Sequence, residues 1–260
     1  MISRKMNSCE PPTWIDSGAS PQLGLEMIHI WRANLELDDK TVGSLEALLS
    51  EDERTRANRF HFANDRRRFT AARGILRSIV GAYLRLPPAN LEFSYGSNGK
   101  PWIKSDGRDE SLSFNLSHTG ETVLYAFRRN HQIGVDVEQL DRRVEYLQIA
   151  REFFAPEEIK SITTLSDEQQ CRRFFEIWTR KEAYLKALGT GLSMPLNEFE
   201  VVSVERNSYD DAGSTDSGRR IGWTFCQFEP QPGHIAAIAT DTGYGQISWW
   251  DWRDGIAVAP

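Results

Sequence analysis

Two carboxylates on one face of a predicted strand could bind a divalent cation. Apolar residues occupy every second position of the segment 133–138, so a strand directs Asp136 and Glu138 to the same face. Adjacent carboxylates repel each other, and a cation between them offsets that cost. Oxygen ligands favour magnesium or calcium over zinc. The pattern is equally typical of a half-exposed strand with a solvated acidic face.

A second candidate set lies on one face of a predicted helix. Trp178, Glu182 and Lys186 follow one another at intervals of four residues, which aligns their side chains along the helix. An ordinary surface Glu–Lys pair beside a core tryptophan gives the same spacing and contributes only about 0.2–0.5 kcal/mol. By its spacing alone, the stripe favours the ordinary surface pair.

Polar residues end the predicted strand that begins at Phe114. Asn115, Ser117 and His118 place an amide, a hydroxyl and an imidazole where the strand stops, and such an edge can hold a phosphate group. The alternative is a turn in which Asn115 or Ser117 caps its own backbone. His118 is not accompanied by a GxSxG motif or a cysteine, so a Ser or Cys triad has little support.

Positive charge is concentrated in one segment. Residues 54–77 contain eight arginines and one acid, a local charge of +7, although the whole chain carries −6. On a helix Arg66, Arg73 and Arg77 form one stripe. This stripe is either a solvent-exposed face of the helix or a binding site for a multiply phosphorylated ligand or an RNA backbone. The net charge excludes a basic coat over the whole surface.

Strands and helices must position these side chains. The last predicted helix, 167–188, has Ser166 as a cap and Gly189 at its end. The pattern predicts other helices over 66–85, 144–154 and 156–162, and strands over 24–34, 91–95, 112–116, 122–128, 133–138, 198–204, 222–228, 234–239 and 247–252. Two similar halves, 24–130 and 131–255, follow an irregular extension over 1–23, and a polar insertion is expected over 207–220.

The composition is that of a globular protein. Apolar residues make up 40% and charged residues 26% of 260 residues, which argues against a disordered, collagen-like or coiled-coil chain. The sequence has no apolar run long enough to span a membrane and no secretory signal near its beginning. We therefore expect a cytoplasmic protein with no membrane partner.

Taken in order, these motifs resemble those of the surfactin-type 4′-phosphopantetheinyl transferases. The resemblance covers roughly residues 30–199 and rests most specifically on the acidic strand and the Trp178 helix. It includes an arginine cluster, Gly99-Lys100-Pro101, Phe114-Asn115-Leu116-Ser117-His118, Gly134-Val135-Asp136-Val137-Glu138 and Trp178-Thr179-Arg180-Lys181-Glu182-Ala183-Tyr184-Leu185-Lys186. It implies an α+β pseudo-dimer, each half a small antiparallel sheet packed with a long helix, with coenzyme A and magnesium bound in the cleft between the halves.

The resemblance also implies roles for individual residues. Asp136 and Glu182 are expected to bind Mg²⁺, with Glu138 as a third ligand. Glu182 is expected to be the base for the carrier serine, and Lys186 to neutralise pyrophosphate charge. The residues expected to contact coenzyme A are Arg56, Gly99, Lys100, Pro101, Asn115, Ser117, His118 and Lys186. A position that is often basic in this family is Glu53 here, which makes Arg56 the expected main contact of the 3′-phosphate.

The implied reaction is transfer of 4′-phosphopantetheine from coenzyme A to the serine of an acyl or peptidyl carrier domain, with release of 3′,5′-ADP. The alternatives are a magnesium-dependent phosphohydrolase and a noncatalytic nucleotide- or RNA-binding module that uses the arginine face. We expect a monomer that binds no nucleic acid. Residues 142–154 follow the acidic strand and are expected to contribute to carrier docking, unless Phe153 and Phe154 belong to the core and Arg142, Arg143 and Arg151 are only solvated.

Overall fold

A computed structural model describes residues 11–16, 22–96, 98–103, 111–141, 143–191, 194–201 and 223–253. The expected insertion over 207–220 and most of the extension over 1–23 lie outside this part of the chain. The helices are α1 (Asp39–Ala47), α2 (Glu51–Ala57), α3 (Ala63–Leu84), α4 (Tyr146–Phe153), α5 (Pro156–Thr163) and α6 (Asp167–Leu188). The strands are β1 (Ile15–Asp16), β2 (Met27–Asn34), β3 (Phe93–Tyr95), β4 (Pro101–Ile103), β5 (Leu112–Thr119), β6 (Thr122–Arg129), β7 (Ile133–Gln139), β8 (Thr224–Phe228), β9 (His234–Thr240) and β10 (Gln246–Asp251).

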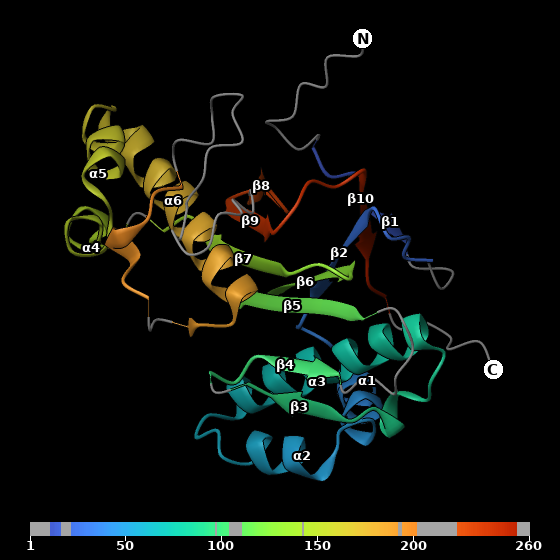
Figure 1. Ribbon diagram of the computed structural model, residues 1–260. Coiled ribbons are helices and arrows are strands. Elements are labelled where there is room, and N and C mark those ends of the chain that lie inside the picture. Colours follow the sequence, from blue (N-terminus) through green and yellow to red (C-terminus); the bar gives the residue numbers. More distant parts are fainter. Residues whose placement is uncertain are drawn as a thin grey trace.

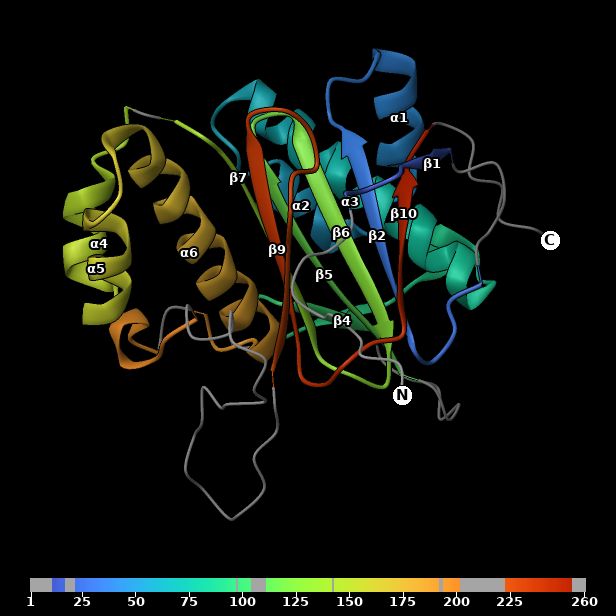
Figure 2. The ribbon, with the colours of Figure 1, turned by 90° about the horizontal axis from the view of Figure 1, so that it is seen from above.

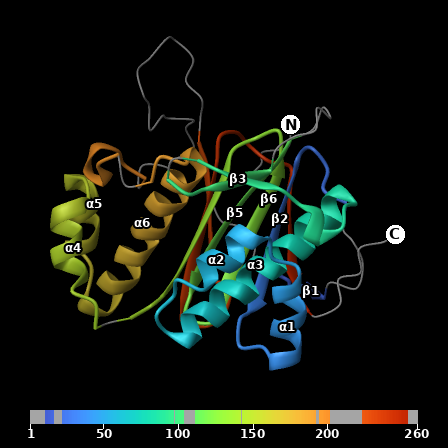
Figure 3. The ribbon, with the colours of Figure 1, turned by 90° about the horizontal axis from the view of Figure 1, so that it is seen from below.

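The first half packs a long helix on a sheet of strand order β1-β10-β2-β6-β5. Helix α3 is amphipathic, and its apolar residues, such as Ala72 and Ile79, are buried in one cluster with Trp31 and Phe127 of the sheet. Figure 3 shows α2 and α3 lying across these strands. The helix ends at Arg85, which takes a left-handed conformation as its C-cap.

The second half repeats this arrangement with a three-stranded sheet of order β7-β9-β8. Helix α6 packs on β7 and β9, and α4 and α5 lie on the far side of α6, as Figure 2 shows. Like α3, α6 has 22 residues and ends at a left-handed C-cap, here Gly189. Because β2-β6-β5 and β7-β9-β8 have the same order, the described residues form the expected α+β pseudo-dimer.

The two sheets pack on each other and form the centre of the molecule. Ile28 and Leu124 from the first sheet share one apolar cluster with Val135 and Ile238 from the second. The helices of the two halves therefore lie on the outer sides of the paired sheets (Figure 1). This packing brings β5 of the first half against β7 of the second.

One feature of the sheets differs from expectation. Strand β10 comes from the end of the chain, but it pairs with β2 of the first sheet, from Gln246 opposite Met27 to Asp251 opposite Arg32. Both β10 pairings are parallel, so this sheet is mixed, whereas an antiparallel sheet was expected. The division at residues 130 and 131 stays a prediction, and β10 crosses it.

The predicted elements agree with the structure except at a few places. The strand expected from residue 198 is wrong over 198–201, where a 3-10 turn, Leu196–Glu198, precedes an extended segment. The short helices α1 and α2 and the short strands β1 and β4 were not predicted. Strand β1 lies in the extension that was expected to be irregular, and it is ordered by pairing with β10. Of the helices described, none combines the length and apolar composition that crossing a bilayer requires.

Candidate active site

The site begins with the close contact between β7 and α6. Gly134 lies so near the helix that a Cβ atom on it would stand 2.0 Å from the carbonyl oxygen of Ala183 and 2.5 Å from the nitrogen of Ala187. Only glycine allows this approach, because a larger residue would push the backbone of α6 away. The acidic face of β7 is thereby brought close to the C-terminal half of α6.

Asp136, Lys186 and Ser117 form a hydrogen-bonded group at this contact. The Lys186 Nζ lies 2.6 Å from Oδ1 of Asp136 and donates to Oγ of Ser117 at 2.8 Å. Ser117 in turn donates to the same Asp136 oxygen at 2.8 Å. Three elements, β5, β7 and α6, therefore supply one polar cluster. Asp136 is almost fully buried.

Two further carboxylates face this group. Burial, followed by the charge of Asp136, raises the pKa of Glu138 to about 7. The same two causes, in the same order, raise the pKa of Glu182. Thr119 donates a hydrogen bond to Glu138 and so favours its charged form. The charge of Asp136 thus opposes ionisation of both glutamates.

These acids are a chemically suitable donor set for a hard divalent cation. Oδ2 of Asp136 is buried without a hydrogen-bond partner among the described residues, which leaves one carboxylate oxygen available as a ligand. Mutual repulsion among Asp136, Glu138 and Glu182 is what a bound cation would remove. In the described part of the chain, no three His, Cys, Asp or Glu side chains already stand at the spacing of a formed metal site.

Asn115 has a role that neither sequence interpretation included. Its Oδ1 accepts a hydrogen bond of 2.9 Å from the backbone nitrogen of Val135. The amide therefore ties β5 to β7 beside Asp136. Whether Asn115 also contacts a ligand stays a prediction.

His118 is exposed at the end of β5. Partial burial of its ring, and then the charges of Lys186 and Arg68, lower its pKa. The imidazole is thus close to the Lys186 group and electrostatically coupled to it. It is neutral at physiological pH and can offer one N–H donor and one acceptor to a ligand.

The arginine stripe has a different role from either one expected. Arg73 and Arg77 are buried, and each bonds the carboxylate of Glu53 at 2.6 Å. Arg73 and Arg77 therefore neither solvate the helix nor form an open phosphate site. Three other arginines of the cluster have acidic partners, Arg66 with Glu46, Arg67 with Asp39, and Arg68 with Glu121. Most of the cluster thus serves the fold.

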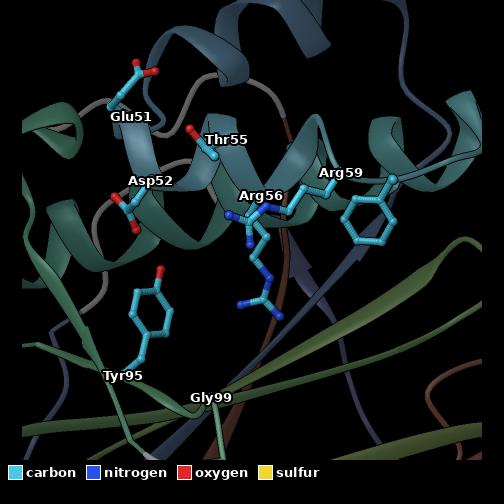
Figure 4. A pocket seen from close by; sticks show the side chains of 8 residues that line it. Glu51, Asp52, Thr55, Arg56, Arg59, Tyr95 and Gly99 are labelled. Atoms are coloured by element: carbon cyan, nitrogen blue, oxygen red, sulfur yellow. The ribbon is translucent and has the colours of Figure 1, made fainter.

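Arg56 lies at a pocket of about 870 Å³ (Figure 4). Arg59, Phe60, Tyr95 and Gly99 also line it. Within the described ranges no ion pair involves Arg56 or Arg59, and the guanidinium of Arg56 stands 5.5 Å from the ring centre of Phe69. Glu51, Asp52 and Thr55 complete the lining, so the pocket combines two cations and two aromatic side chains with two carboxylates. The two arginines could bind a phosphate group of a nucleotide.

The glycine-rich turn reaches this pocket from the opposite side. Gly99 takes a left-handed conformation, with φ of 75°, and Pro101 begins β4. Lys100 lies between them, and its ammonium group bonds backbone carbonyl oxygens. The Lys100 Nζ lies 2.8 Å from the carbonyl oxygen of Ala187. Burial lowers the pKa of Lys100 to about 8. Gly99 therefore lines the pocket, whereas Lys100 bonds the end of α6.

Sequence reasoning did not identify several residues that shape the site. Glu53 closes a capping box with Ser50, and that spacing could have indicated its position at the start of a helix. Gly134 could have been noticed as a glycine inside a strand pattern, which often marks a close backbone approach. No sequence signal pointed to Thr119 or Asn98, because their partners are distant in the chain.

Comparisons with known proteins agree with this geometry. The family profile of the 4′-phosphopantetheinyl transferase superfamily matches residues 132–249, and the profile of the 4′-phosphopantetheinyl transferase N-terminal region matches residues 38–130. The chain is 38% identical over 241 residues to the 4′-phosphopantetheinyl transferase HetI of Nostoc, covering 92% of this chain and 98% of HetI.

Two further relatives come from distant organisms. The 4′-phosphopantetheinyl transferase Sfp of Bacillus subtilis is 32% identical over 155 residues, which cover 60% of this chain and 66% of Sfp. A phosphopantetheinyl transferase of Thraustochytrium is 29% identical over 214 residues, covering 78% of this chain and 74% of the relative. The two family profiles together span both halves of the fold and include the acidic strand. This chain therefore belongs to the 4′-phosphopantetheinyl transferase superfamily.

Proposed function

We propose that this enzyme transfers 4′-phosphopantetheine from coenzyme A to a serine of an acyl or peptidyl carrier protein, with Mg²⁺ as cofactor and 3′,5′-ADP as the second product. The observation that carries the proposal is the group formed by Asp136, Lys186 and Ser117, with Glu138 and Glu182 beside it. Carboxylates and an ammonium group in one place suit the breaking of a pyrophosphate bond, which develops negative charge on the departing oxygen.

In this proposal Asp136, Glu138 and Glu182 hold the magnesium ion. When bound, Mg²⁺ supplies positive charge at the pyrophosphate oxygens and stabilises the charge that develops there. The serine oxygen of the carrier forms a bond to the phosphorus atom that bears pantetheine, and the pyrophosphate P–O bond breaks. Glu182 takes the serine proton as the general base.

Lys186 is positioned to serve the departing group. In the described conformation its ammonium is held by Asp136 and Ser117. If Asp136 served as a magnesium ligand, Lys186 would be free to donate to the pyrophosphate oxygens instead. His118, coupled electrostatically to Lys186, is proposed to contact the same ligand, and Arg56 the 3′-phosphate from the pocket of about 870 Å³.

Gly99 lines that pocket, and we propose that it and Pro101 shape the nucleotide side of the site. The expected contact between coenzyme A and Lys100 stays a prediction, and the contacts of Lys100 lead to a further inference below. We also propose that the enzyme is a cytoplasmic monomer, since its two halves already pack the sheets that a dimer of single halves would bring together.

The segment 142–154, which includes helix α4, is proposed to form part of the carrier-docking surface. Phe153 is 39% exposed and Arg151 is exposed, whereas Phe154 is buried in the core with Phe174. Phe154 is therefore a core residue and does not contribute to docking. Arg143 is exposed and bonded to Asp141. Arg142 lies outside the described residues.

The alternatives account for fewer of the observations. An RNA-binding face needs exposed arginines, but Arg73 and Arg77 are buried with Glu53. A phosphohydrolase would use the same acids, and it differs in its acceptor, which is water.

Intact-mass analysis of an apo carrier domain tests the function directly. After incubation with coenzyme A and Mg²⁺, the carrier should gain the mass of one phosphopantetheine group. A carrier with alanine in place of its serine should gain nothing. Cleavage of coenzyme A that continues without any carrier would instead favour the hydrolase, and RNA binding without either reaction would favour the noncatalytic module.

A further inference from the structure

One ammonium group connects three elements that are far apart in the sequence. Lys100 stands at the end of the turn between β3 and β4, in the first half of the fold. Its Nζ donates to the carbonyl oxygen of Ala187 at 2.8 Å and to that of Ile133 at 3.4 Å. Ala187 lies in the last turn of α6 and Ile133 is the first residue of β7.

A second side chain of the same turn holds the chain just beyond that helix. The Nδ2 of Asn98 donates to the carbonyl oxygens of Gly189 and Thr190, at 3.0 Å and 2.7 Å. Two glycines with positive φ allow this close fit. A Cβ on Gly189 would stand 3.4 Å from Cδ of Lys100, and one on Gly191 would stand 3.2 Å from Cγ of Asn98.

These contacts satisfy groups that a helix cannot satisfy by itself. The last carbonyl oxygens of an α-helix have no partner within the helix, and they carry the negative end of its dipole. The ammonium and the amide N–H₂ group donate hydrogen bonds to these oxygens, and the charge of the ammonium offsets the negative end of the dipole. The turn that holds Lys100 and Asn98 thus completes the C-terminal end of α6 from the other half of the molecule.

The positions of the bonded carbonyls connect this cap to the candidate active site. Ala187 directly follows Lys186, and Ile133 is three residues before Asp136. The two elements that Lys100 joins therefore carry the Asp136–Lys186 pair. On the other side of the same turn, Gly99 lines the pocket that contains Arg56.

We propose that Lys100 is a positioning residue that, together with Asn98, holds the end of α6 against the start of β7 and so fixes Lys186 relative to Asp136. The Gly99 turn extends this connection to the nucleotide pocket. The consequence for catalysis rests on the proposed function. The structural connection itself does not depend on that function.

Kinetics distinguish positioning from a direct contact with coenzyme A. Lys100→Met keeps the apolar stem and removes the ammonium, so kcat should fall about tenfold or more while KM for coenzyme A changes less than about threefold. Lys100→Arg keeps a cation with N–H donors and should restore most of kcat. Asn98→Ala should show the same pattern to a smaller degree. A large rise in KM with unchanged kcat in Lys100→Met would mean that the ammonium binds coenzyme A and would overturn the proposal.

Amide hydrogen exchange gives a readout that needs neither substrate nor activity. In Lys100→Met, backbone amides over 185–191 and 133–136 should exchange about tenfold faster than in the wild-type protein. Lys160→Met, which removes an exposed lysine of α5, is the matched control and should leave both segments unchanged. Unchanged exchange in Lys100→Met would refute the connection, whatever the kinetics. If exchange is faster in Lys100→Met but the wild-type protein transfers no phosphopantetheine, the connection is supported and the proposed function is rejected.

Discussion

Arg77 and Lys181 occupy the same position in the two long helices, fourteen residues after the first residue of α3 and of α6. Each bonds a buried glutamate from the short helix that precedes its own long helix. Arg77 bonds Glu53 at 2.6 Å, and Lys181 bonds Glu158 at 2.8 Å. Both glutamates also accept a hydrogen bond from a backbone nitrogen at the start of their short helix.

This repeated ion pair stabilises the fold of each half and takes no part in the proposed reaction. Each half needs a buried partner for the cation of its long helix, because an unpaired buried charge costs about 3–5 kcal/mol. The chemical groups are not repeated. Where α6 has Glu182, α3 has Ser78 at the matching position, and its hydroxyl bonds the carbonyl of Gly74 in its own helix. The proposed catalytic acids therefore belong to the second half alone.

Asp136→Asn and Glu182→Gln should each abolish most of the transfer without unfolding the protein. Loss of a group that stabilises the departing charge typically lowers kcat about 10²–10³-fold. Kinetics at saturating Mg²⁺, with melting temperatures measured in parallel, check this. Glu176→Gln, on the outer part of α6, is the matched control and should keep its activity. Near wild-type rates in either site variant would contradict the assignment of the acids.

Arg56→Ala and His118→Ala should weaken binding of coenzyme A more than binding of its analogue without the 3′-phosphate. Charge-assisted hydrogen bonds contribute about 1.5–3 kcal/mol, so Arg56→Ala should raise Kd for coenzyme A at least about tenfold. Calorimetric titration with both ligands measures the difference. Arg54→Ala removes a neighbouring half-buried arginine that does not line the pocket, and it should change neither Kd. Equal losses for the two ligands would place Arg56 and His118 away from the 3′-phosphate.

Arg143→Glu and Arg151→Glu should raise KM for the carrier and leave the affinity for coenzyme A unchanged. Both arginines are exposed and belong to the same segment as the exposed Phe153, and carrier domains modified by this family are expected to be acidic around their serine. The rise in KM should shrink as added salt screens the attraction. Steady-state kinetics at two ionic strengths measure it. An unchanged carrier KM in both variants would remove the segment 142–154 from the interface.

Gly134→Ala should lower both stability and kcat. The added Cβ would meet the Ala183 carbonyl at 2.0 Å, so α6 must move away from β7 and Lys186 from Asp136. Overpacking of this kind costs about 1–3 kcal/mol. Thermal unfolding and kinetics measure the two effects. Gly243→Ala, at a glycine with open space around it, should leave both unchanged.

Acid should destabilise the protein through His29. This side chain is buried, its Nδ1 lies 2.7 Å from the hydroxyl of Tyr83, and burial lowers its pKa to about 4. Between pH 6.5 and 4 the unfolded chain binds a proton at this residue that the folded chain does not, so stability is present at neutral pH and is lost as pH falls.

Because of His29, the free energy of unfolding should be about 2 kcal/mol lower at pH 5 than at pH 7.5. Urea unfolding of wild-type protein and His29→Gln at both pH values measures it. The variant should lose less stability than the wild type between the two values. His131→Gln removes a half-exposed histidine and should keep the wild-type dependence. The same pH dependence in wild type and His29→Gln would show that other groups cause the loss.

The sequence by itself determined the long elements and the family. Helix α6 has the predicted bounds, with Ser166 at the N-cap position and Gly189 as a left-handed C-cap. Both signals are local in sequence, although the Ser166 hydroxyl bonds the Gln169 side chain and not a backbone N–H. Strand β7 was likewise predicted from its alternating pattern, and so was the shared face of Asp136 and Glu138. These features depend on residues close together in the chain.

The tertiary structure alone decided which distant residues meet. Periodicity cannot distinguish a solvated arginine from a buried one, and Arg73 and Arg77 are buried because Glu53 comes to them from another helix. Strand β10 joins β2 because pairing between segments distant in sequence is selected by packing of whole sheets. In the same way Ser117 reaches Asp136, and Lys100 reaches the end of α6, only after the two halves have packed against each other.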